Sequence, residues 1–383
     1  MRVLYITHVD DLTGANSSLL QLISELRDNH GVNPVVIYPK RKPTGKKNIT
    51  DVLAQRNIKG IACGRMVCFQ REHTGFIYKI YFILSDIINL IQILYACRGL
   101  KFDLVHTNTS ILDLGHYIAK IYRIPHVWHL REVASLSFGY KSIFGDTYTK
   151  WLYTQADRTI AISQNVKKEF TPLINSERTR VIYNGVLPPS SLKQPLYENE
   201  VNNICIVGRV EQNKNQMEAV RAIKILSDNG IKNIKLYIIG DYDNEYGRAV
   251  RQFVVDNNIV SYVEFMGLRS NVHQLLGDMI IGLMLSRHEA FGRVTIEYMQ
   301  HKLFAIASNT SANVEIVEDG KNGFLYDYGN PRSLAEKIEY VICHKKELED
   351  IAEQGYKDAT TKYLSTENSK RIFSVYKELL CQQ

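Results

Sequence analysis

The stretch SRHEAFGRVTIEYM, residues 286–299, decides how the rest of the chain is interpreted. Two carboxylates, Glu289 and Glu297, stand on either side of a turn that contains Gly292, and apolar residues follow at helical spacing. The first N–H groups of a helix have no intrahelical partner, so a helix that starts here offers a site for an anion, most often a phosphate. Eight residues of helix separate two side chains by roughly 12 Å and about 80° of rotation. We therefore expect two separate hydrogen-bond acceptors for one long ligand, not an acid–base pair.

The composition indicates a globular protein of two domains. The chain has 383 residues, more than one ordinary core, with 45% hydrophobic and 23% charged residues. Its net charge of +7 suits anionic ligands or an anionic membrane surface, but no basic tract is dense enough to indicate nucleic acid. The six cysteines lack the spacing of metal ligands, which indicates reduced thiols and predicts a cytoplasmic protein. The N-terminal segment MRVLYITHVDD enters a strand pattern directly, so we expect no signal peptide.

Short β-branched runs alternate with helix-length segments along the whole chain, which is typical of α/β folds with parallel sheets covered on both faces. The proline-containing segment 185–200 breaks this alternation and predicts a linker. We predict two Rossmann-like, doubly wound domains, residues 1–190 and 191–365, and a C-terminal helix over 366–383 that crosses back to the first domain. Such domains bind ligands at the carboxyl ends of their strands, so we expect the site in a cleft between them.

The most hydrophobic segment, residues 76–100, predicts a long helix. Four polar residues make it a poor membrane span, namely Lys79, Asp86, Asn89 and Gln92. Packing in the core is the favoured interpretation, and contact with a membrane is the alternative.

Several basic residues of the first half are compatible with peripheral docking at the inner membrane surface. They are the loop KRKPTGKK at 40–47 together with Arg65, Arg71 and Lys79. An ordinary solvated surface explains them equally well.

Two cations follow a predicted strand in the segment ICIVGRVEQNKNQ. Arg209 and Lys214 lie five residues apart beside Gly208. An arginine grips two phosphate oxygens at once, and a lysine supplies a mobile point charge, so the pair suits a diphosphate. A solvated basic loop is the alternative. In the first half, Gly14 joins a strand to a helix in DDLTGANSS, where it either admits a ligand or only satisfies the turn.

The two strongest segments together resemble a known family. VGRVEQNKN, followed later by SRHEAFGRVTIEYM, is similar to the retaining GT-B-fold glycosyltransferases of family 4, the glycosyl transferases group 1. Their signature is an acid, seven residues and a second acid, which Glu289 and Glu297 match. SNTSANVEIVEDGKNGFLY (308–326), AISQNVKKEF (161–170) and VIYNGV (181–186) resemble other parts of the family, so the resemblance spans the chain.

The resemblance implies a role for each matching residue. Arg209 and Lys214 would hold the diphosphate of the donor, Glu289 would accept hydrogen bonds from the transferred sugar, and Glu297 would bind the ribose. The remaining donor contacts would be Gly14, Gly267, Leu268, Arg269, Phe291, Gly292, Arg293 and Val294. Many family members have a second glycine at Thr13 and an aliphatic residue at Arg293, so this chain departs from the pattern at both positions.

His129, in HVWHLREV, matches a family histidine that touches the transferred sugar. A lone histidine is more often structural than catalytic, and three others are nearby in the sequence: His106, His116 and His126. Arg131 and Glu132 would shape the acceptor site.

The implied catalytic set is therefore Glu289, Arg209, Lys214 and His129. The cations and the helix N-terminus would stabilise the leaving diphosphate, with no metal and no cofactor beyond a UDP- or GDP-linked sugar. The expected acceptor is a saccharide or a lipid-linked acceptor, in polysaccharide or lipopolysaccharide synthesis at the cytoplasmic face of the membrane. A nucleotide-sugar epimerase or hydrolase of the same fold, and a non-catalytic nucleotide-sugar-binding protein, remain the alternatives.

Overall fold

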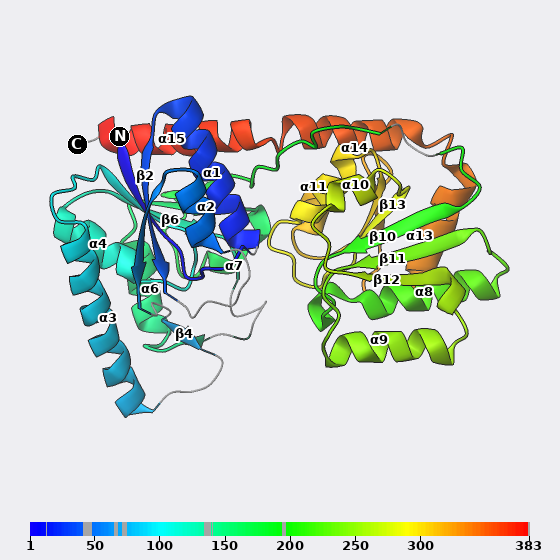
Figure 1. Cartoon of the computed structure of the whole chain (residues 1–383), viewed down its shortest axis with the longest axis horizontal. Coiled ribbons are helices and arrows are strands. Elements are labelled where there is room, and N and C mark those ends of the chain that lie inside the picture. The colour runs from blue at the N-terminus through cyan, green and yellow to red at the C-terminus, as the bar shows by residue number, and fades with distance from the viewer. Residues whose placement is uncertain are drawn as a thin grey trace. The chain divides into compact units, whose positions relative to one another are not determined.

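The computed structural model describes residues 1–12, 14–40, 48–64, 68–70, 75–133, 139, 141–193 and 197–381. The chain divides into two compact units, Met1–Gly185 with Ser365–Gln383, and Val186–Leu364 (Figure 1). Each unit has a parallel sheet with helices packed on it, which confirms the predicted fold class. The predicted domain boundaries differ from these units at two places. Residues 186–190 were predicted in the first domain but belong to the second unit, and Ser365 was predicted in the second domain but belongs to the first unit.

The first unit is built on a seven-stranded parallel sheet with the order β3-β2-β1-β5-β6-β8-β9. Its strands are β1 (Arg2–Ile6), β2 (Asn33–Pro39), β3 (Lys59–Cys63), β5 (Leu104–Thr107), β6 (His126–Leu130), β8 (Arg158–Ala161) and β9 (Thr179–Val181). The β-branched and aliphatic runs of these strands are buried, as expected for a sheet covered on both faces. The strand order reverses between β1 and β5, so the loops after these two strands flank the expected ligand crevice of this unit.

Helices and one short strand pair surround this sheet. They are α1 (Gly14–His30), α2 (Ile49–Gln55), α3 (Phe76–Ala96), α4 (Leu114–Tyr122), α6 (Asp146–Thr154), α7 (Gln164–Phe170) and α15 (Ser365–Cys381), with β4 (Phe69–Gln70) paired to β7 (Lys141–Ser142). The last helix, α15, packs along α1, and its Ile372 and Tyr376 join the same buried cluster as Leu19 and Ile23. This helix is therefore part of the core of the first unit.

Helix α3 packs on the core with one narrow side only, so the favoured interpretation of residues 76–100 as a core helix was wrong for most of its apolar side chains. Its buried residues are Phe82, Asn89 and Ile93, whereas Phe76 and Ile77 are 77% and 84% exposed. In the described parts of the chain, α3 is the one helix whose length and composition would allow it to cross a membrane. Most of its apolar side chains are exposed, whereas Asn89 is buried and Asp86 is half-buried.

The basic residues proposed for membrane docking are only partly described. Of the loop at 40–47, the structure describes Lys40, which is exposed, and Lys79 is half-buried on α3. Residues 41–47, Arg65 and Arg71 lie outside the described residues.

The second unit has a six-stranded parallel sheet with the order β12-β11-β10-β13-β14-β15. Its strands are β10 (Asn202–Val207), β11 (Ile234–Ile239), β12 (Val263–Gly267), β13 (Ile281–Met284), β14 (Phe304–Ser308) and β15 (Phe324–Tyr326). Its helices are η1 (Gln212–Lys214), α8 (Gln216–Asp228), α9 (Glu245–Asp256), η2 (Val260–Tyr262), α10 (Val272–Leu276), α11 (Arg293–Gln300), α12 (Asn313–Ile316), α13 (Pro331–His344) and α14 (Glu349–Thr361). The order reverses between β10 and β13, and the stretch 286–299 follows β13 at that point.

The chain enters and leaves the second unit at neighbouring positions. In the first unit, a Cβ on Gly185 would lie 2.4 Å from the Cα of Ser365. In the second unit, the N–H of Val186 donates to the carbonyl of Tyr363 at 2.8 Å. The second unit is thus one continuous insertion, whereas the first is completed only by the C-terminal helix.

Candidate functional site

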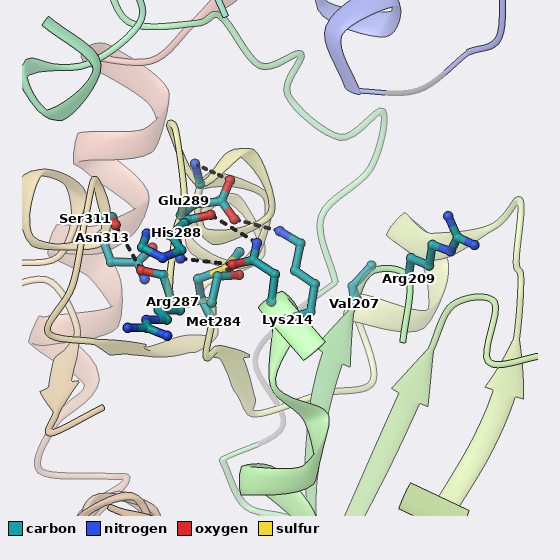
Figure 2. Close-up of polar contacts among 12 residues, drawn as sticks. Val207, Arg209, Lys214, Met284, Arg287, His288, Glu289, Ser311 and Asn313 are labelled. Atoms are coloured by element: carbon teal, nitrogen blue, oxygen red, sulfur yellow. Dashed lines mark hydrogen bonds and ion pairs between the residues drawn. The ribbon is translucent and has the colours of Figure 1, made fainter. Parts of the chain in front are cut away.

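Lys214 and Glu289 form an ion pair at the carboxyl edge of the second sheet. Lys214 ends the turn after β10, and Glu289 lies in the loop after β13. The Lys214 Nζ is 2.6 Å from the Glu289 Oε2, and the two side chains are 25% and 16% exposed (Figure 2). Burial alone would raise the pKa of Glu289, but the charge of Lys214 and hydrogen bonds from Lys214, Ser286 and Gly292 bring that pKa below its usual value. Glu289 is therefore an ionised acceptor, unsuited to donating a proton.

Asn213 holds the two loops of this ion pair together. Its Oδ1 accepts from the N–H of His288 at 3.1 Å, and its Nδ2 donates to the carbonyl of His288 at 3.1 Å. Its own carbonyl accepts from the N–H of Arg287 at 3.1 Å. The next-but-one residue, Asn215, has a φ of 56°, which turns the chain into α8. Sequence analysis missed Asn213, although an asparagine beside Lys214 in a strand-end loop was the available signal.

The loop after β14 supports the same stretch from its other side. Ser308 and Ser311 donate from their hydroxyls to the carbonyls of Ser286 and Arg287, both at 2.9 Å. Asn313 donates to the Ser308 hydroxyl at 2.8 Å, while its buried Oδ1 has no partner in the part of the chain that the structure describes. Because buried polar atoms normally have partners, this acceptor is suited to a ligand hydroxyl.

Helix α11 is fixed in place by Tyr298 and Gly282. The Tyr298 ring is fully buried against β13, where a Cβ on Gly282 would lie 2.3 Å from the ring. The Tyr298 hydroxyl accepts from the N–H of Val207 at 2.9 Å, at the end of β10. Only glycine at position 282 leaves room for this ring, so α11 is anchored directly beside the point where the strand order reverses.

The predicted turn at Gly292, followed by a helix, is present. Gly292 has a φ of 88°, and its N–H donates to the Glu289 Oε1 at 3.3 Å before α11 begins at Arg293. The side chain of Phe291 is buried with its ring 5.9 Å from that of Tyr363, and Val294 packs in an apolar cluster. Phe291 and Val294 can therefore serve a ligand through their backbone N–H groups only.

Arg293 and Glu297 pair with each other along α11. The Arg293 Nε is 3.0 Å from the Glu297 Oε1, and the side chains are 29% and 13% exposed. This is a helical i,i+4 contact. Arg293 therefore neutralises part of the charge of Glu297, and the structure places the two acids of the signature in separate ion pairs.

Arg209 stands apart from the Lys214–Glu289 pair. It is exposed, and Figure 2 shows its guanidinium pointing away from the pair. Within the described ranges its side chain has no ion pair or hydrogen bond. Arg209 thus offers an uncommitted cation just after β10, whereas Lys214 is already paired.

The predicted base-lining residues lie after β12. Gly267 accepts through its carbonyl from the N–H of Gly240 at 3.0 Å, and Leu268 is 77% exposed beside an exposed Arg269. The strand order places β11 and β10 between β12 and β13. These residues and Glu289 therefore lie at the carboxyl ends of strands of the same sheet, with β11 and β10 between them.

In the first unit, Gly14 begins α1, and no atom lies within 4 Å of where its Cβ would be. His129 lies on β6, as predicted, but it is fully buried. Its Nδ1 is 3.1 Å from the Nε2 of His106, whose Nδ1 is 2.6 Å from the Tyr376 hydroxyl. The His129 Nε2 has no partner among the described residues. Burial, and to a smaller extent Arg131, lowers the pKa of His129 well below its usual value, so this ring is a neutral hydrogen-bonding group.

Arg131 and Glu132 belong to a polar network that includes residues not predicted from the sequence. The Arg131 Nε donates to the Asn108 Oδ1 at 2.7 Å. Glu132 accepts from the Thr109 hydroxyl at 2.5 Å and from the backbone N–H of Ser110 at 2.9 Å. These three residues follow β5, so they lie at the point where the strand order of the first sheet reverses.

Possible metal ligands do not gather in the part of the chain that the structure describes. The described ranges contain no group of three or more histidine, cysteine, aspartate or glutamate side chains that could hold a metal ion. One Asp-x-Asp sequence, at Asp241 and Asp243, follows β11. There the Asp241 Oδ1 accepts from the N–H of Asp243 at 3.1 Å, which is the hydrogen bond of a local turn.

Two family models match the chain. The model described as glycosyl transferases group 1 matches residues 190–358, and that of glycosyltransferase family 4 matches residues 12–188. An uncharacterized glycosyltransferase of Methanocaldococcus jannaschii is 29% identical over 282 residues, which are 72% of this chain and 76% of the relative. A capsular polysaccharide biosynthesis glycosyltransferase, CapM, of Staphylococcus aureus is 27% identical over 176 residues, 45% of each chain.

A solved structure shows the same fold. The structure of Anabaena HepE in complex with UDP has a TM-score of 0.82 and 20% identity, and covers 99% of this chain and 100% of that one. Taken together, the two family models and the GT-B fold show that this chain belongs to the group 1 glycosyltransferases of family 4.

Proposed function

We propose that this chain transfers a sugar, with retention of its anomeric configuration, from a nucleotide-diphosphate donor to a saccharide or lipid-linked acceptor. The observation that carries the proposal is the Lys214–Glu289 pair beside the N-terminus of α11. An ionised acid, a cation and the first N–H groups of a helix meet there, at the carboxyl edge of a parallel sheet. This combination suits a ligand with both hydroxyl groups and phosphates.

In the proposed reaction, the bond from the sugar to the diphosphate breaks, and negative charge develops on the leaving oxygen. Lys214, Arg209 and the N–H groups at the start of α11 stabilise that charge where it develops. Glu289 accepts hydrogen bonds from hydroxyls of the transferred sugar. The acceptor attacks from the face that the diphosphate leaves, and a phosphate oxygen takes the proton of the acceptor, so no side-chain base is required.

The other predicted residues complete the donor site in this proposal. The Oε1 of Glu297 pairs with Arg293, so its Oε2 is the atom proposed to accept from the ribose hydroxyls. The backbone from Gly267 to Arg269 lines the base. In the first unit, the resemblance assigns ligand contacts to Gly14 and to His129, whose neutral and fully buried ring has one atom, Nε2, without a partner among the described residues.

We propose UDP as the nucleotide, because the HepE structure contains UDP, with GDP as the alternative. The named role of CapM in capsular polysaccharide synthesis supports a role in cell-surface polysaccharide assembly, and lipopolysaccharide is a related product class. In this proposal the enzyme works without a metal at the cytoplasmic face of the membrane.

The test is a panel of UDP- and GDP-linked sugars, assayed for nucleotide release with and without saccharide acceptors and with a chelator. We expect one donor class to be turned over, unaffected by the chelator, and NMR of the product to show the anomeric configuration of the donor. Glu289→Gln and Lys214→Ala should each abolish transfer. Inversion, a chelator-sensitive rate, or full activity in both variants would contradict the proposal.

The same assay separates the two alternatives. An epimerase or hydrolase would convert the donor without an acceptor, at a rate that added acceptor does not change. A binding protein would bind the nucleotide sugar in calorimetry and release no nucleotide.

A further inference from the structure

The outward face of α3 is a continuous apolar surface. Ten large apolar side chains of this helix are between 43% and 84% exposed: Phe76, Ile77, Ile80, Tyr81, Ile83, Leu84, Ile87, Ile88, Ile91 and Tyr95. At the angular spacing of an α-helix they fall within about 160° of its circumference. The buried Phe82, Asn89 and Ile93 lie on the opposite side.

Unlike a solvated surface helix, α3 has an apolar side that faces outward. Its one acid, Asp86, is half-buried on the side of the protein, where burial and the nearby Asp113 raise its pKa to about 8. The Asn89 Oδ1 accepts from the N–H of Gly64 at 2.9 Å. A helix normally exposes its polar side and buries its apolar side, so the outward face of α3 is shaped for a partner other than water.

Neighbouring helices extend this face. Tyr117 and Ile121 on α4 are 36% and 51% exposed, and Trp151 on α6 is 46% exposed. Helix α4 packs beside α3 (Figure 1). The Tyr117 hydroxyl is 2.8 Å from that of Tyr148 on α6. We call these three residues and the ten exposed residues of α3 the α3 surface. It covers three helices of one unit.

The charges favour an anionic lipid surface as the occupant. The first unit has 27 lysines and arginines against 16 aspartates and glutamates, and the second has 20 against 24, so their formal charges are +11 and −4. Exposed Lys120 and Lys150 lie on the same helices as the α3 surface, and the Arg98 guanidinium stacks 4.4 Å from the Tyr95 ring. An apolar face with tyrosine, tryptophan and basic residues, on a positively charged unit, complements the boundary between anionic headgroups and hydrocarbon.

From this geometry we infer that α3 lies in the plane of an anionic bilayer, with the α3 surface inserted at the headgroup boundary. The helix does not span the bilayer, because Ile93 and Asn89 hold it against the first unit and Asp86 would have to enter hydrocarbon. This lipid contact does not depend on the proposed reaction, since it involves none of the donor-site residues.

The test is co-sedimentation of the full chain with vesicles, without nucleotide sugar. One set of vesicles is phosphatidylcholine, and the other is phosphatidylcholine mixed with phosphatidylglycerol. We expect binding to the mixed vesicles, weakened by salt, with a blue shift of the Trp151 emission. The triple variant Ile77→Ser, Leu84→Ser, Ile88→Ser should reduce the partition coefficient by more than about tenfold, because three large apolar groups no longer enter the bilayer.

The matched control is Val255→Ser with Val260→Ser, two residues of the second unit that are each 58% exposed. This variant should bind vesicles as the unchanged chain does, and circular dichroism should show both variants folded. Because the substituted side chains are exposed, the triple variant should keep its turnover of a soluble acceptor. The inference is overturned if the unchanged chain binds neither vesicle type, if the triple variant binds equally well, or if the chain is a dimer that the triple variant dissociates. The last result would assign the α3 surface to a second copy of the chain.

Discussion

Removing the charge of Lys214 tests the candidate site in two independent ways. In Lys214→Met, Glu289 keeps its burial but loses the ammonium group 2.6 Å away. A charged hydrogen bond at a site this protected contributes roughly 1.5–3 kcal/mol, so we expect the second unit to lose about 2 kcal/mol of its free energy of unfolding at neutral pH. Transfer should also fall by about 10²–10³, the usual effect of losing one charge stabiliser of a transition state.

The loss of stability should depend on Glu289 and on pH. The folded-state pKa of Glu289 is below its usual value of 4.5, so the pair stabilises the fold above that pH and ceases to do so as the pH falls through the folded pKa. The difference between the unchanged chain and Lys214→Met should therefore be constant near neutrality and shrink below about pH 4.5. In a Glu289→Gln background, Lys214→Met should have little further effect on stability.

The assay is urea unfolding of the four proteins of this double-mutant cycle, followed by fluorescence across the pH range, with transfer rates measured in parallel. The Lys214–Glu289 ion pair would be refuted if the free energy of unfolding of Lys214→Met at neutral pH equalled that of the unchanged chain. It would also be refuted if the effect of Lys214→Met were equally large in the Glu289→Gln background.

Three further predictions follow from single contacts. Arg209→Gln should leave the free energy of unfolding unchanged, because the Arg209 side chain is exposed. The same substitution should reduce transfer by about 10²-fold. A large loss of stability in urea unfolding would show that Arg209 makes a structural contact instead. Asn213→Ala should destabilise the second unit by roughly 1–3 kcal/mol, because two hydrogen bonds to His288 are lost. It should also slow transfer, because Lys214 is displaced. Unchanged kinetics would show that Lys214 does not need this support. Tyr376→Phe removes the hydroxyl that lies 2.6 Å from the His106 Nδ1. We expect the free energy of unfolding to fall by about 1–2 kcal/mol, and ¹⁵N NMR to show a changed tautomer of His106 or His129. Identical spectra would contradict the hydrogen-bonded connection from Tyr376 through His106 to His129.

The sequence was sufficient to predict the fold and the residues that meet in the Lys214–Glu289 ion pair. The alternation of buried strands and helices gave both sheets, because a two-sided parallel sheet needs continuous apolar runs. The strand-end positions of Lys214 and Glu289 brought them together at the reversal of strand order. Residues such as Asn213 were missed because a loop asparagine has no periodicity, and its partners lie about seventy positions away.

The surroundings of individual side chains were harder to predict. The pattern at 76–96 identifies a helix with one strongly apolar side, but it does not say whether that side faces a core or the exterior. His129 was placed correctly on its strand, yet its full burial and its pairing with His106, which contacts Tyr376 from the other end of the chain, have no signal in the sequence. Arg293 and Glu297 have the spacing of a helical ion pair, but the resemblance directed attention to phosphate and ribose instead.

The adjacent ends of the second unit have a practical consequence for engineering. The second unit is a single cassette, residues 186–364, whose two junctions meet at Gly185 and Ser365. The corresponding unit of another family member can therefore be exchanged by two cuts, with α15 left on the first unit, whose core it completes. A chimera cut once, in the linker, would carry a foreign C-terminal helix against α1 and lose that packing.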